Sequence, residues 1–264
     1  MYLINLSSST VRLVNVYNEI IPQEKLKEKI LNKNLNFKNK INFRNISFKY
    51  DQKDYVFKNL NLIINRSDKV FISGPSGSGK STLVELLCGL NSPTEGNILI
   101  DEIKLDHLNK NIWLNSIGFV GQKNFLFNKS IKENIFDGNI SATEELYSKA
   151  LEVSHTIDFM KENKISDNEI VSQTQDNLSG GQLKRISIAR ALIKNPKILI
   201  LDEATNEFDK NLETKIITKI IEKYPGITIF FISHNLQNTQ FCNKFLTIKN
   251  KKIFEENKWK FITL

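Results

Sequence analysis

Residues 74–82, with the sequence GPSGSGKST, have the composition needed to bind a phosphate group. They fit the pattern G-x-x-x-x-G-K-[ST] and lie between an apolar run typical of a strand and a helical pattern. Glycines let successive N–H groups converge on phosphate oxygens, the helix N-terminus adds the positive end of its dipole, and Lys80 adds a mobile cation. The alternative, a glycine-rich turn that only connects a strand to a helix, is disfavoured by this agreement of pattern and context. The expected phosphate site comprises Gly74, Pro75, Ser76, Gly77, Ser78, Gly79, Lys80, Ser81 and Thr82.

Two carboxylates follow a second apolar run, ILIL at residues 198–201. If this run is a strand of a parallel sheet, Asp202 and Glu203 lie at its carboxyl edge, where ligands of such folds bind. We expect Asp202 to hold the shell of a Mg²⁺ ion, and Ser81 to offer that ion a hydroxyl. Glu203 is expected to polarise the attacking water as a general base. The alternative, a strand that ends in a solvated acidic turn, is weakened by the phosphate loop earlier in the chain.

Residues 178–182, with the sequence LSGGQ, form a second potential anion-binding helix start. Ser179 and the two glycines after it could bind a γ-phosphate through N–H groups, a hydroxyl and the helix dipole. Five fixed positions of this kind arise by chance in a chain of this length with a probability on the order of 10⁻⁴. Together with LKRISIARA at residues 183–191, the segment resembles the signature of ATP-binding cassette (ABC) ATPases.

That resemblance implies ATP and Mg²⁺ as ligands and a dimer with two ATP molecules at its interface. In the family, the signature of one subunit closes over the phosphate-loop nucleotide of another, head to tail. Further ATP-binding residues would then be Ser179, Gly180, Gly181 and Gln182.

Three more residues resemble family elements in the expected order. Tyr50, 24 residues before Gly74, takes the position of the aromatic that stacks on adenine, although such a residue could also be an ordinary sheet aromatic. Gln122 matches the glutamine that contacts Mg²⁺ and water and links to the membrane domain. His234 matches the switch histidine at the γ-phosphate. The resemblance therefore implies Lys80, Gln122, Glu203 and His234 as catalytic residues, and Ser81, Gln122 and Asp202 as Mg²⁺ ligands.

The elements that position these residues alternate between strand and helix patterns. Together they predict an α/β fold: a P-loop NTPase core with a mostly parallel central sheet, an antiparallel β subdomain at its N-terminal side, and an inserted α-helical subdomain carrying the signature. Helices are expected over residues 80–87, 141–161 and 211–224, the second opened by a capping box of Ser141 and Glu144. Strands are expected over residues 41–43, 46–50, 60–64, 69–73, 97–100, 118–120, 197–201, 228–232 and 245–248.

The chain is expected to divide near Lys40. Residues 41–264 would form the ABC ATPase domain, with its helical subdomain at about 123–190. Residues 1–40 would form a helix over 9–21 and a Lys/Asn-rich linker. This first part resembles the cytoplasmic end of the last membrane helix in fused exporters, and the alternative is a private helix that packs on its own domain.

Departures from the family pattern occur in two segments. Residues 206–208, with the sequence NEF, stand where Ser-Ala-Leu is usual, just before Asp209, the last position of that loop. Residues 171–177 lack the Gly-Glu-Arg-Gly-like stretch of typical exporters. In contrast, LFNKSIKENI at residues 126–135 closely resembles the corresponding exporter segment, and so the subfamily prediction favours exporters.

Composition limits the class of protein and its partners. The 264 residues are 40% hydrophobic and 25% charged, as in ordinary globular proteins, and no apolar run reaches the roughly 20 residues that cross a bilayer. The net charge of +8 comes from scattered lysines, which favours solubility over nucleic-acid binding. Cys88 and Cys242 are expected to be reduced and buried, and His107 and His155 to lie on the surface.

These observations predict the ATPase of an ABC exporter. The expected partners are a second ABC domain, in a homodimer, and a transmembrane domain on the same precursor or on a separate chain. Contact with the membrane would come only through that partner, at the cytoplasmic face of the inner membrane, and no nucleic acid is expected. Two alternatives stay open: a soluble ABC ATPase acting on nucleic acid or ribosomes, and a catalytically silent regulatory ABC module.

Overall fold

A computed structural model of the chain describes residues 37–51, 54–123, 125–171, 178–204, 208–233 and 235–258. The helix expected over residues 9–21, the switch histidine His234, and most of the two departing segments lie outside this part of the chain. Within it, no helix is long and apolar enough to cross a membrane.

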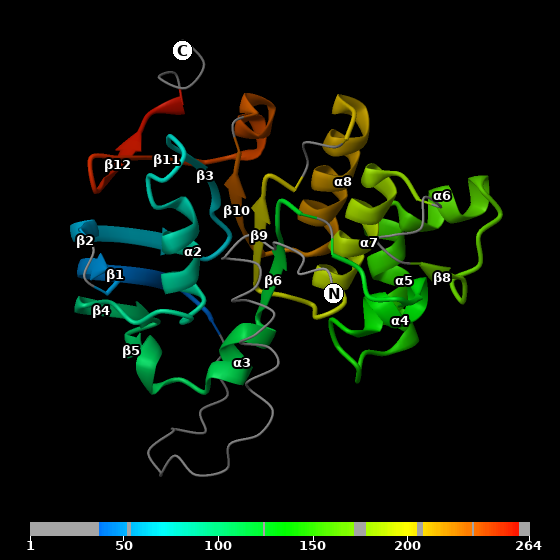
Figure 1. Cartoon of the computed structure of the whole chain (residues 1–264), viewed down its shortest axis with the longest axis horizontal. Coiled ribbons are helices and arrows are strands. Elements are labelled where there is room, and N and C mark those ends of the chain that lie inside the picture. Colours follow the sequence, from blue (N-terminus) through cyan, green and yellow to red (C-terminus); the bar gives the residue numbers. More distant parts are fainter. Residues whose placement is uncertain are drawn as a thin grey trace, which may run out of the picture.

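The central sheet has the mostly parallel arrangement that the sequence predicts (Figure 1). Neighbouring strands are parallel throughout, except that the edge strand β12 pairs antiparallel with β11. Because β3, β9 and β6 run in the same direction, the loops after their carboxyl ends meet at one edge of the sheet. In spatial order, the described strands are β12 (Lys252–Glu256), β11 (Lys244–Lys249), β3 (Lys69–Ser73), β10 (Thr228–Ile232), β9 (Ile198–Asp202) and β6 (Ile117–Val120).

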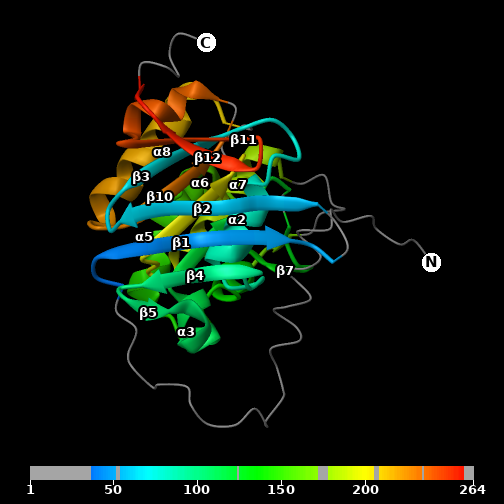
Figure 2. The same cartoon turned by 90° about the vertical axis from the view of Figure 1, so that its left-hand side faces the viewer.

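A second, antiparallel sheet lies beside the first (Figure 2). The sequence pattern indicates two short strands, at 41–43 and 46–50, where the structure has the single strand β1 (Lys40–Lys49). Asn45 lies within β1 at a φ of 52°, and the register with β2 shifts at this point, so a bulge interrupts the alternation of side chains. The spatial order is β2 (Tyr55–Asn65), β1, β4 (Glu95–Ile100) and β5 (Ile103–Lys104).

Helices cover both faces of the central sheet. The structure places α2 where the sequence predicts it, and it adds the short helices α3 and α4 that the pattern did not indicate. Short 3₁₀ segments occur at Leu105–His107 and Leu236–Phe241, and β7 (Lys129–Ser130) pairs with β8 (Ile170–Val171). The α-helices are α2 (Lys80–Leu87), α3 (Lys110–Asn115), α4 (Ile131–Phe136), α5 (Glu144–Val153), α6 (Thr156–Glu162), α7 (Gly180–Leu192) and α8 (Lys210–Lys223).

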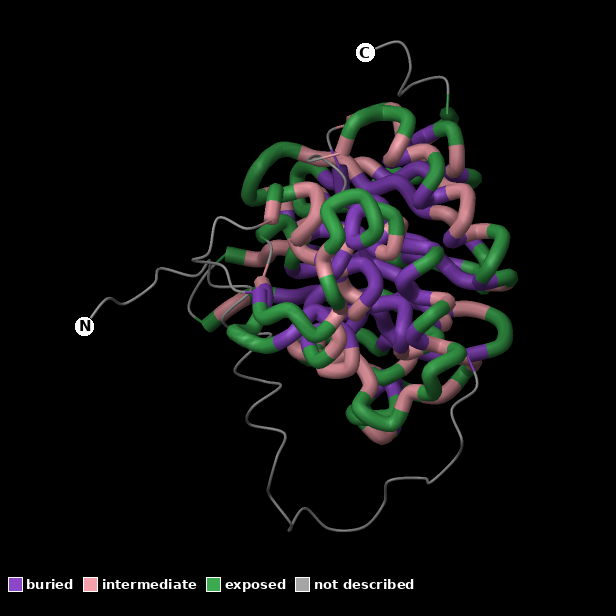
Figure 3. Tube along the Cα trace, turned by 90° about the vertical axis from the view of Figure 1, so that its right-hand side faces the viewer, coloured by how far each residue is buried: buried purple, intermediate pink, exposed green. Residues whose placement is uncertain are grey.

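Alternating side chains of the central strands divide the core into two clusters. In β9, Ile198 and Ile200 belong to the cluster that includes α2 and the antiparallel sheet. Leu199 and Leu201 belong to the cluster that includes α5, α7 and α8. Consequently α2 and α7 lie on opposite faces of the sheet (Figure 1). Figure 3 shows the buried segments gathered inside this layered arrangement and the exposed ones in its outer loops.

The prediction of a single helix over residues 141–161 is wrong, because the helix starts later and is divided into α5 and α6. Helix α5 begins at Glu144 because the hydroxyl of Thr143, not that of Ser141, accepts a hydrogen bond from the N–H of Leu146. The helix then breaks at His155, whose φ of 57° lies in the left-handed region, and α6 starts anew. His155 is also less exposed than expected, since its side chain is 12% accessible.

The buried cysteines and the exposed His107 agree with the sequence prediction.

Candidate active site

The loop between β3 and α2 has the strained backbone that a phosphate cradle requires. Gly79 occupies the N-cap position of α2 at a φ of 109°, and a Cβ there would lie 2.8 Å from Val56 Cγ1. Gly77 has a φ of 75°, but a Cβ there would meet no atom within 4 Å. The loop is therefore packed against β2 at its base and open to solvent at its tip, where Pro75, Ser76 and Gly77 are exposed.

Lys80 folds back over this loop. Its ammonium donates hydrogen bonds to the carbonyl oxygens of Gly74, at 2.6 Å, and Pro75, at 3.1 Å. Ser81, the next residue, is exposed in the first turn of α2. The loop therefore combines a helix N-terminus, a cation bonded to two backbone carbonyls, and an exposed hydroxyl, which together suit a phosphate chain and its metal.

Thr82 and Tyr50 meet beside the phosphate loop. The hydroxyl oxygens of these two residues lie 3.0 Å apart, and the hydroxyl of Tyr50 donates a 2.7 Å hydrogen bond to Glu85 Oε2. The side-chain amide of Asn91 donates to the same carboxylate oxygen. Tyr50 is thereby fixed to α2 by its polar end, while its ring also packs edge-on against Phe48 at 4.9 Å. Glu85 could not be connected to this site from the sequence, because it lies within the apolar pattern of a helix.

The two acids stand at the carboxyl end of β9. Glu203 has a φ of 50°, a left-handed conformation uncommon for a non-glycine residue, and its N–H donates to the carbonyl of Ile232 at 2.8 Å. The side-chain amide of Gln122, which follows the neighbouring strand β6, donates a 2.8 Å hydrogen bond to Glu203 Oε2. The parallel sheet therefore brings Gln122 and Glu203 together.

Asp202 is half-buried at the carboxyl end of β9. Burial and, to a smaller degree, the neighbouring Glu203 raise the pKa of Asp202 to about 6, against the ammonium groups of Lys80 and Lys184, which lower it. At pH 7 the carboxyl group is still mostly ionised. Lys80 and Asp202 thus influence each other across the site, which links the phosphate loop to the end of β9.

The signature residues form the start of α7. Ser179 is the N-cap, its hydroxyl accepts from the N–H of Gln182 at 3.3 Å, and the side chain of Gln182 accepts from the N–H of Ser179 at 2.8 Å. This capping box fixes the helix end, and Ser179 and Gly180 remain exposed. The second anion-binding terminus is therefore well formed, but on the face of the sheet opposite to α2.

Phe208 and Asp209, at the end of the loop that differs from the family pattern, contribute to the core and to a helix cap. Asp209 caps α8, since its carboxylate accepts from the N–H groups of Asn211 and Leu212, each at 2.9 Å. The ring of Phe208 is partly buried against the core. Asn206 and Glu207 lie outside the described residues, as does His234, so their predicted contributions stay predictions.

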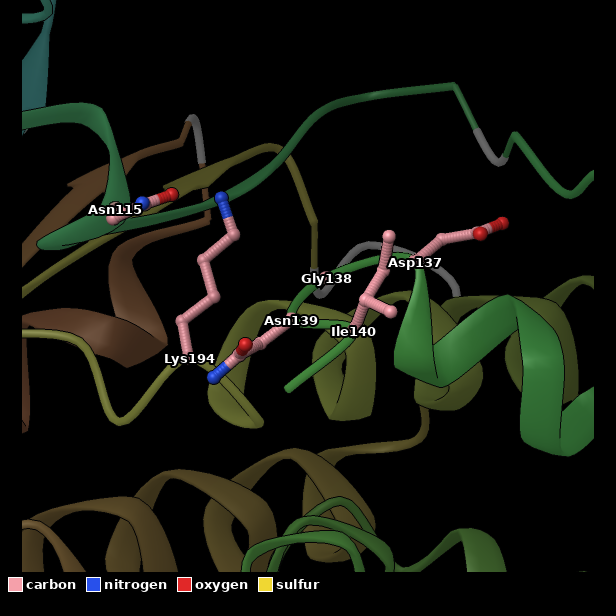
Figure 4. A pocket seen from close by; sticks show the side chains of 6 residues that line it. All are labelled: Asn115, Asp137, Gly138, Asn139, Ile140 and Lys194. Atoms are coloured by element: carbon pink, nitrogen blue, oxygen red, sulfur yellow. The ribbon is translucent and has the colours of Figure 1, made fainter. Parts of the chain in front are cut away.

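A cavity of about 240 Å³ lies away from these residues (Figure 4). Two of its lining residues, Asn115 and Lys194, precede β6 and β9, and so the cavity lies towards the amino edge of the sheet. None of the predicted site residues lines it. Its lining residues are Asn115, Asp137, Gly138, Asn139, Ile140 and Lys194.

Comparisons with known proteins agree with the fold and the motifs. The family model described as "ABC transporter" matches residues 57–206, more than half of the chain. The alpha-hemolysin translocation ATP-binding protein HlyB of Escherichia coli is 37% identical over 255 residues, which are 96% of this chain and 35% of that protein. The ATP-dependent permease MDL1 of Candida albicans is 37% identical over 225 residues, 83% of this chain and 33% of that protein.

A solved structure titled as a bacterial Atm1-family ABC exporter with ATP bound resembles the fold with a TM-score of 0.82 and 27% identity, over 96% of this chain and 45% of that one. The chain spans about a third of the length of these two curated relatives. The matched segment runs from β2, before the phosphate loop, through the signature to the two acids. The chain therefore belongs to the ABC transporter family, as an ATP-binding, ATP-hydrolysing domain of the exporter type.

Proposed function

We propose that the chain drives export across a membrane by closing, head to tail with a second copy, around two ATP molecules. One observation supports this arrangement most directly. The two anion-binding helix starts, at α2 and α7, belong to opposite faces of the central sheet and to separate core clusters. A γ-phosphate held at the start of α2 would therefore meet the exposed start of α7 of the other copy rather than of its own.

Binding of ATP would begin at the open phosphate loop. The N–H groups of the loop and of the first turn of α2 would hold the phosphate oxygens, and Lys80 would exchange the carbonyls of Gly74 and Pro75 for phosphate. The ring of Tyr50, fixed beside α2 through its hydroxyl, would stack on adenine. We assign the remaining contacts to Ser76, Ser78 and Thr82 on this side of the dimer, and to Ser179, Gly180, Gly181 and Gln182 across it.

Hydrolysis would be carried out by the residues at the carboxyl edge of the sheet. Glu203 would take a proton from the attacking water, and Gln122, now bonded to Glu203, would orient that water. We also assign the γ-phosphate contact to His234. Ser81, Gln122 and Asp202 offer the hard oxygen ligands that Mg²⁺ prefers, and the bound ion would neutralise charge that develops on the phosphates.

The consequence for transport is a cycle of closing and opening. The dimer would be stable only while γ-phosphates join the two surfaces, and hydrolysis would remove that link. The motion would pass through the Gln122 region to a transmembrane domain, on the same precursor or a separate chain, at the cytoplasmic face of the inner membrane. The membrane-spanning partner would select the transported substrate.

The experiment that tests this function measures ATP hydrolysis by the purified chain against protein concentration, with Glu203→Gln as the control for contaminating ATPase. We expect activity per chain to rise with concentration and to vanish in the variant, and we expect Glu203→Gln to elute as a dimer with ATP and Mg²⁺. A variant that stays monomeric with ATP contradicts the closed dimer. A wild-type chain with no more activity than the variant at any concentration supports the silent regulatory module instead.

A further inference from the structure

Lys184 is a charged residue in an unusual environment. It lies on α7, five residues after the N-cap Ser179, and its side chain is fully buried. Burial of an ammonium group is costly unless hydrogen bonds replace its water. The ammonium of Lys184 donates to the backbone carbonyls of Gly121, at 2.9 Å, and Gln122, at 2.8 Å. The signature helix is therefore bonded directly to the main chain of the loop that follows β6.

A second cation of α7 holds the same loop further along. Arg190 is six residues after Lys184, and its guanidinium donates to the carbonyl of Phe125 at 2.7 Å. The same group donates to the carbonyl and to the side chain of Asn134, at 2.7 and 2.8 Å. Two cations of one helix thus bond backbone carbonyls on both sides of the Gln122 side chain, which fixes this loop to α7.

The loop fixed in this way reaches the acid that would act as general base. The residue whose carbonyl accepts from Lys184 is Gln122, and its side-chain amide donates to Glu203 at 2.8 Å. Only the length of one glutamine therefore separates the buried ammonium from the carboxylate. A side-chain amide on an unconstrained loop would sample many positions, whereas a main chain held at its carbonyls limits them.

We propose that Lys184 is a positioning residue for ATP hydrolysis, which holds the main chain of Gln122 to the signature helix and so sets the position of its amide relative to Glu203. This inference rests on the proposed function of Glu203 and Gln122. It predicts that Lys184 acts through Gln122 rather than through nucleotide binding, because its hydrogen bonds are to the carbonyls of Gly121 and Gln122. Its ammonium also acts on the carboxyl of Asp202, and the Gln122→Ala background separates that direct effect from positioning.

The test compares steady-state hydrolysis and nucleotide affinity in Lys184→Met, which keeps an unbranched side chain but removes the donor. We expect kcat to fall at least tenfold, while KM and the affinity for a fluorescent N-methylanthraniloyl ATP change less than twofold. In a Gln122→Ala background, Lys184→Met is expected to lower kcat by less than twofold, because the residue through which it acts is absent. Equal losses in both backgrounds, or an unchanged kcat in Lys184→Met alone, would overturn the inference.

Two further variants separate positioning from loss of stability. Ile186→Ala shortens a fully buried apolar side chain of the same helix and leaves the hydrogen bonds of Lys184 to Gly121 and Gln122 in place, so at an equal fall in Tm its kcat should stay within twofold of wild type. Lys184→Gln keeps a shorter donor, and we expect a two- to fivefold loss of kcat that disappears in the Gln122→Ala background. This variant also decides the matter if Lys184→Met does not fold, and a loss of equal size in both backgrounds counts against the inference. If the proposed function itself is wrong, the wild type and Glu203→Gln will show the same residual activity.

Discussion

The hydroxyl of Tyr50 donates a 2.7 Å hydrogen bond to the carboxylate of Glu85, which ties the end of β1 to the middle of α2. Glu85 is 8% exposed and also accepts from Asn91, so this carboxylate joins α2 to the residue after β1 and to the segment after α2. Tyr50, proposed to stack on adenine, is therefore hydrogen-bonded to the helix that follows the phosphate loop. A change at Tyr50 should affect both stability and nucleotide binding.

Tyr50→Phe keeps the ring and removes the bond to Glu85. We expect a loss of about 2 kcal/mol in the free energy of unfolding, typical of a hydrogen bond to a charged group, and a three- to tenfold loss of ATP affinity because the ring is no longer fixed. Urea unfolding and titration with ATP measure the two effects. Tyr55→Phe is the matched control, since within the described residues Tyr55 makes its contacts through its ring, over which Lys49 and Lys58 lie. An equal loss in both variants would refute the assignment.

Asp202 should make the nucleotide-free protein less stable as pH rises. Burial raises the pKa of its carboxyl to about 6, above its ordinary value near 3.8, so folding favours the protonated form. The group therefore costs almost nothing below about pH 3, and its cost grows as pH rises through the unfolded pKa, to roughly 3 kcal/mol at pH 7. Asp202→Asn, which cannot ionise, should be more stable than wild type at pH 7 by up to roughly that amount, with the difference falling below about 1 kcal/mol at pH 4.

Urea unfolding at pH 4, 5, 6 and 7, with EDTA and without nucleotide, measures this difference. Asp106→Asn, at an exposed aspartate, serves as the control and should show no comparable gain as pH rises. Asp202→Asn should also lose ATPase activity, so that stability and activity change in opposite directions. A wild type that is as stable as Asp202→Asn at pH 7 would show that the carboxyl is not destabilised in the fold.

The parts of the structure that the sequence predicted are those in which local chemistry decides the conformation. Helix α2 has the predicted bounds because a glycine-rich loop precedes it and Gly89 follows it. Helices α3 and α4 were missed because six residues are too few to show helical periodicity, and their polar caps are the main signal. Strand β12, with the sequence KIFEE, is a polar edge strand, and its pairing with β11 gives little trace in composition.

The same distinction applies to the site. The phosphate loop, the two acids and the signature are recognisable because their residue types are tied to backbone turns and helix starts. Lys184 and Glu85 are not, since a charged residue in a helical pattern is usually solvated, and only packing against a neighbouring segment shows that they are buried. Tertiary contacts, rather than local sequence, assign these two residues to the site.

Two glycines of the phosphate loop should respond differently to alanine. At Gly77 the added methyl enters open space at a φ of 75°, so the cost to stability should be about 1 kcal/mol. At Gly79 the methyl lies 2.8 Å from Val56 and 3.0 Å from Phe57, so a loss of roughly 3 kcal/mol is expected. Relative to its small loss of stability, Gly77→Ala should lose more ATP affinity than Gly79→Ala, because the methyl of Gly77→Ala occupies the open side of the cradle. Urea unfolding and ATP titration of both variants test this, and a stability loss at Gly77 as large as at Gly79 would contradict it.

Ser179 should matter more to the ATP-bound dimer than to the folded monomer. Its hydroxyl caps α7 by accepting from the N–H of Gln182, so Ser179→Ala should cost about 1 kcal/mol of stability. Thr143 makes the equivalent cap on α5, where its hydroxyl accepts from the N–H of Leu146 at 3.3 Å, and Thr143→Ala should cost a similar amount.

In the Glu203→Gln background with ATP, size exclusion at falling protein concentration measures the affinity of the dimer. Only Ser179→Ala should weaken it, by at least tenfold, because its exposed helix start would bind the γ-phosphate of the other copy. If Thr143→Ala weakens the dimer as much, the effect comes from helix stability, and the signature has no direct contact with the nucleotide.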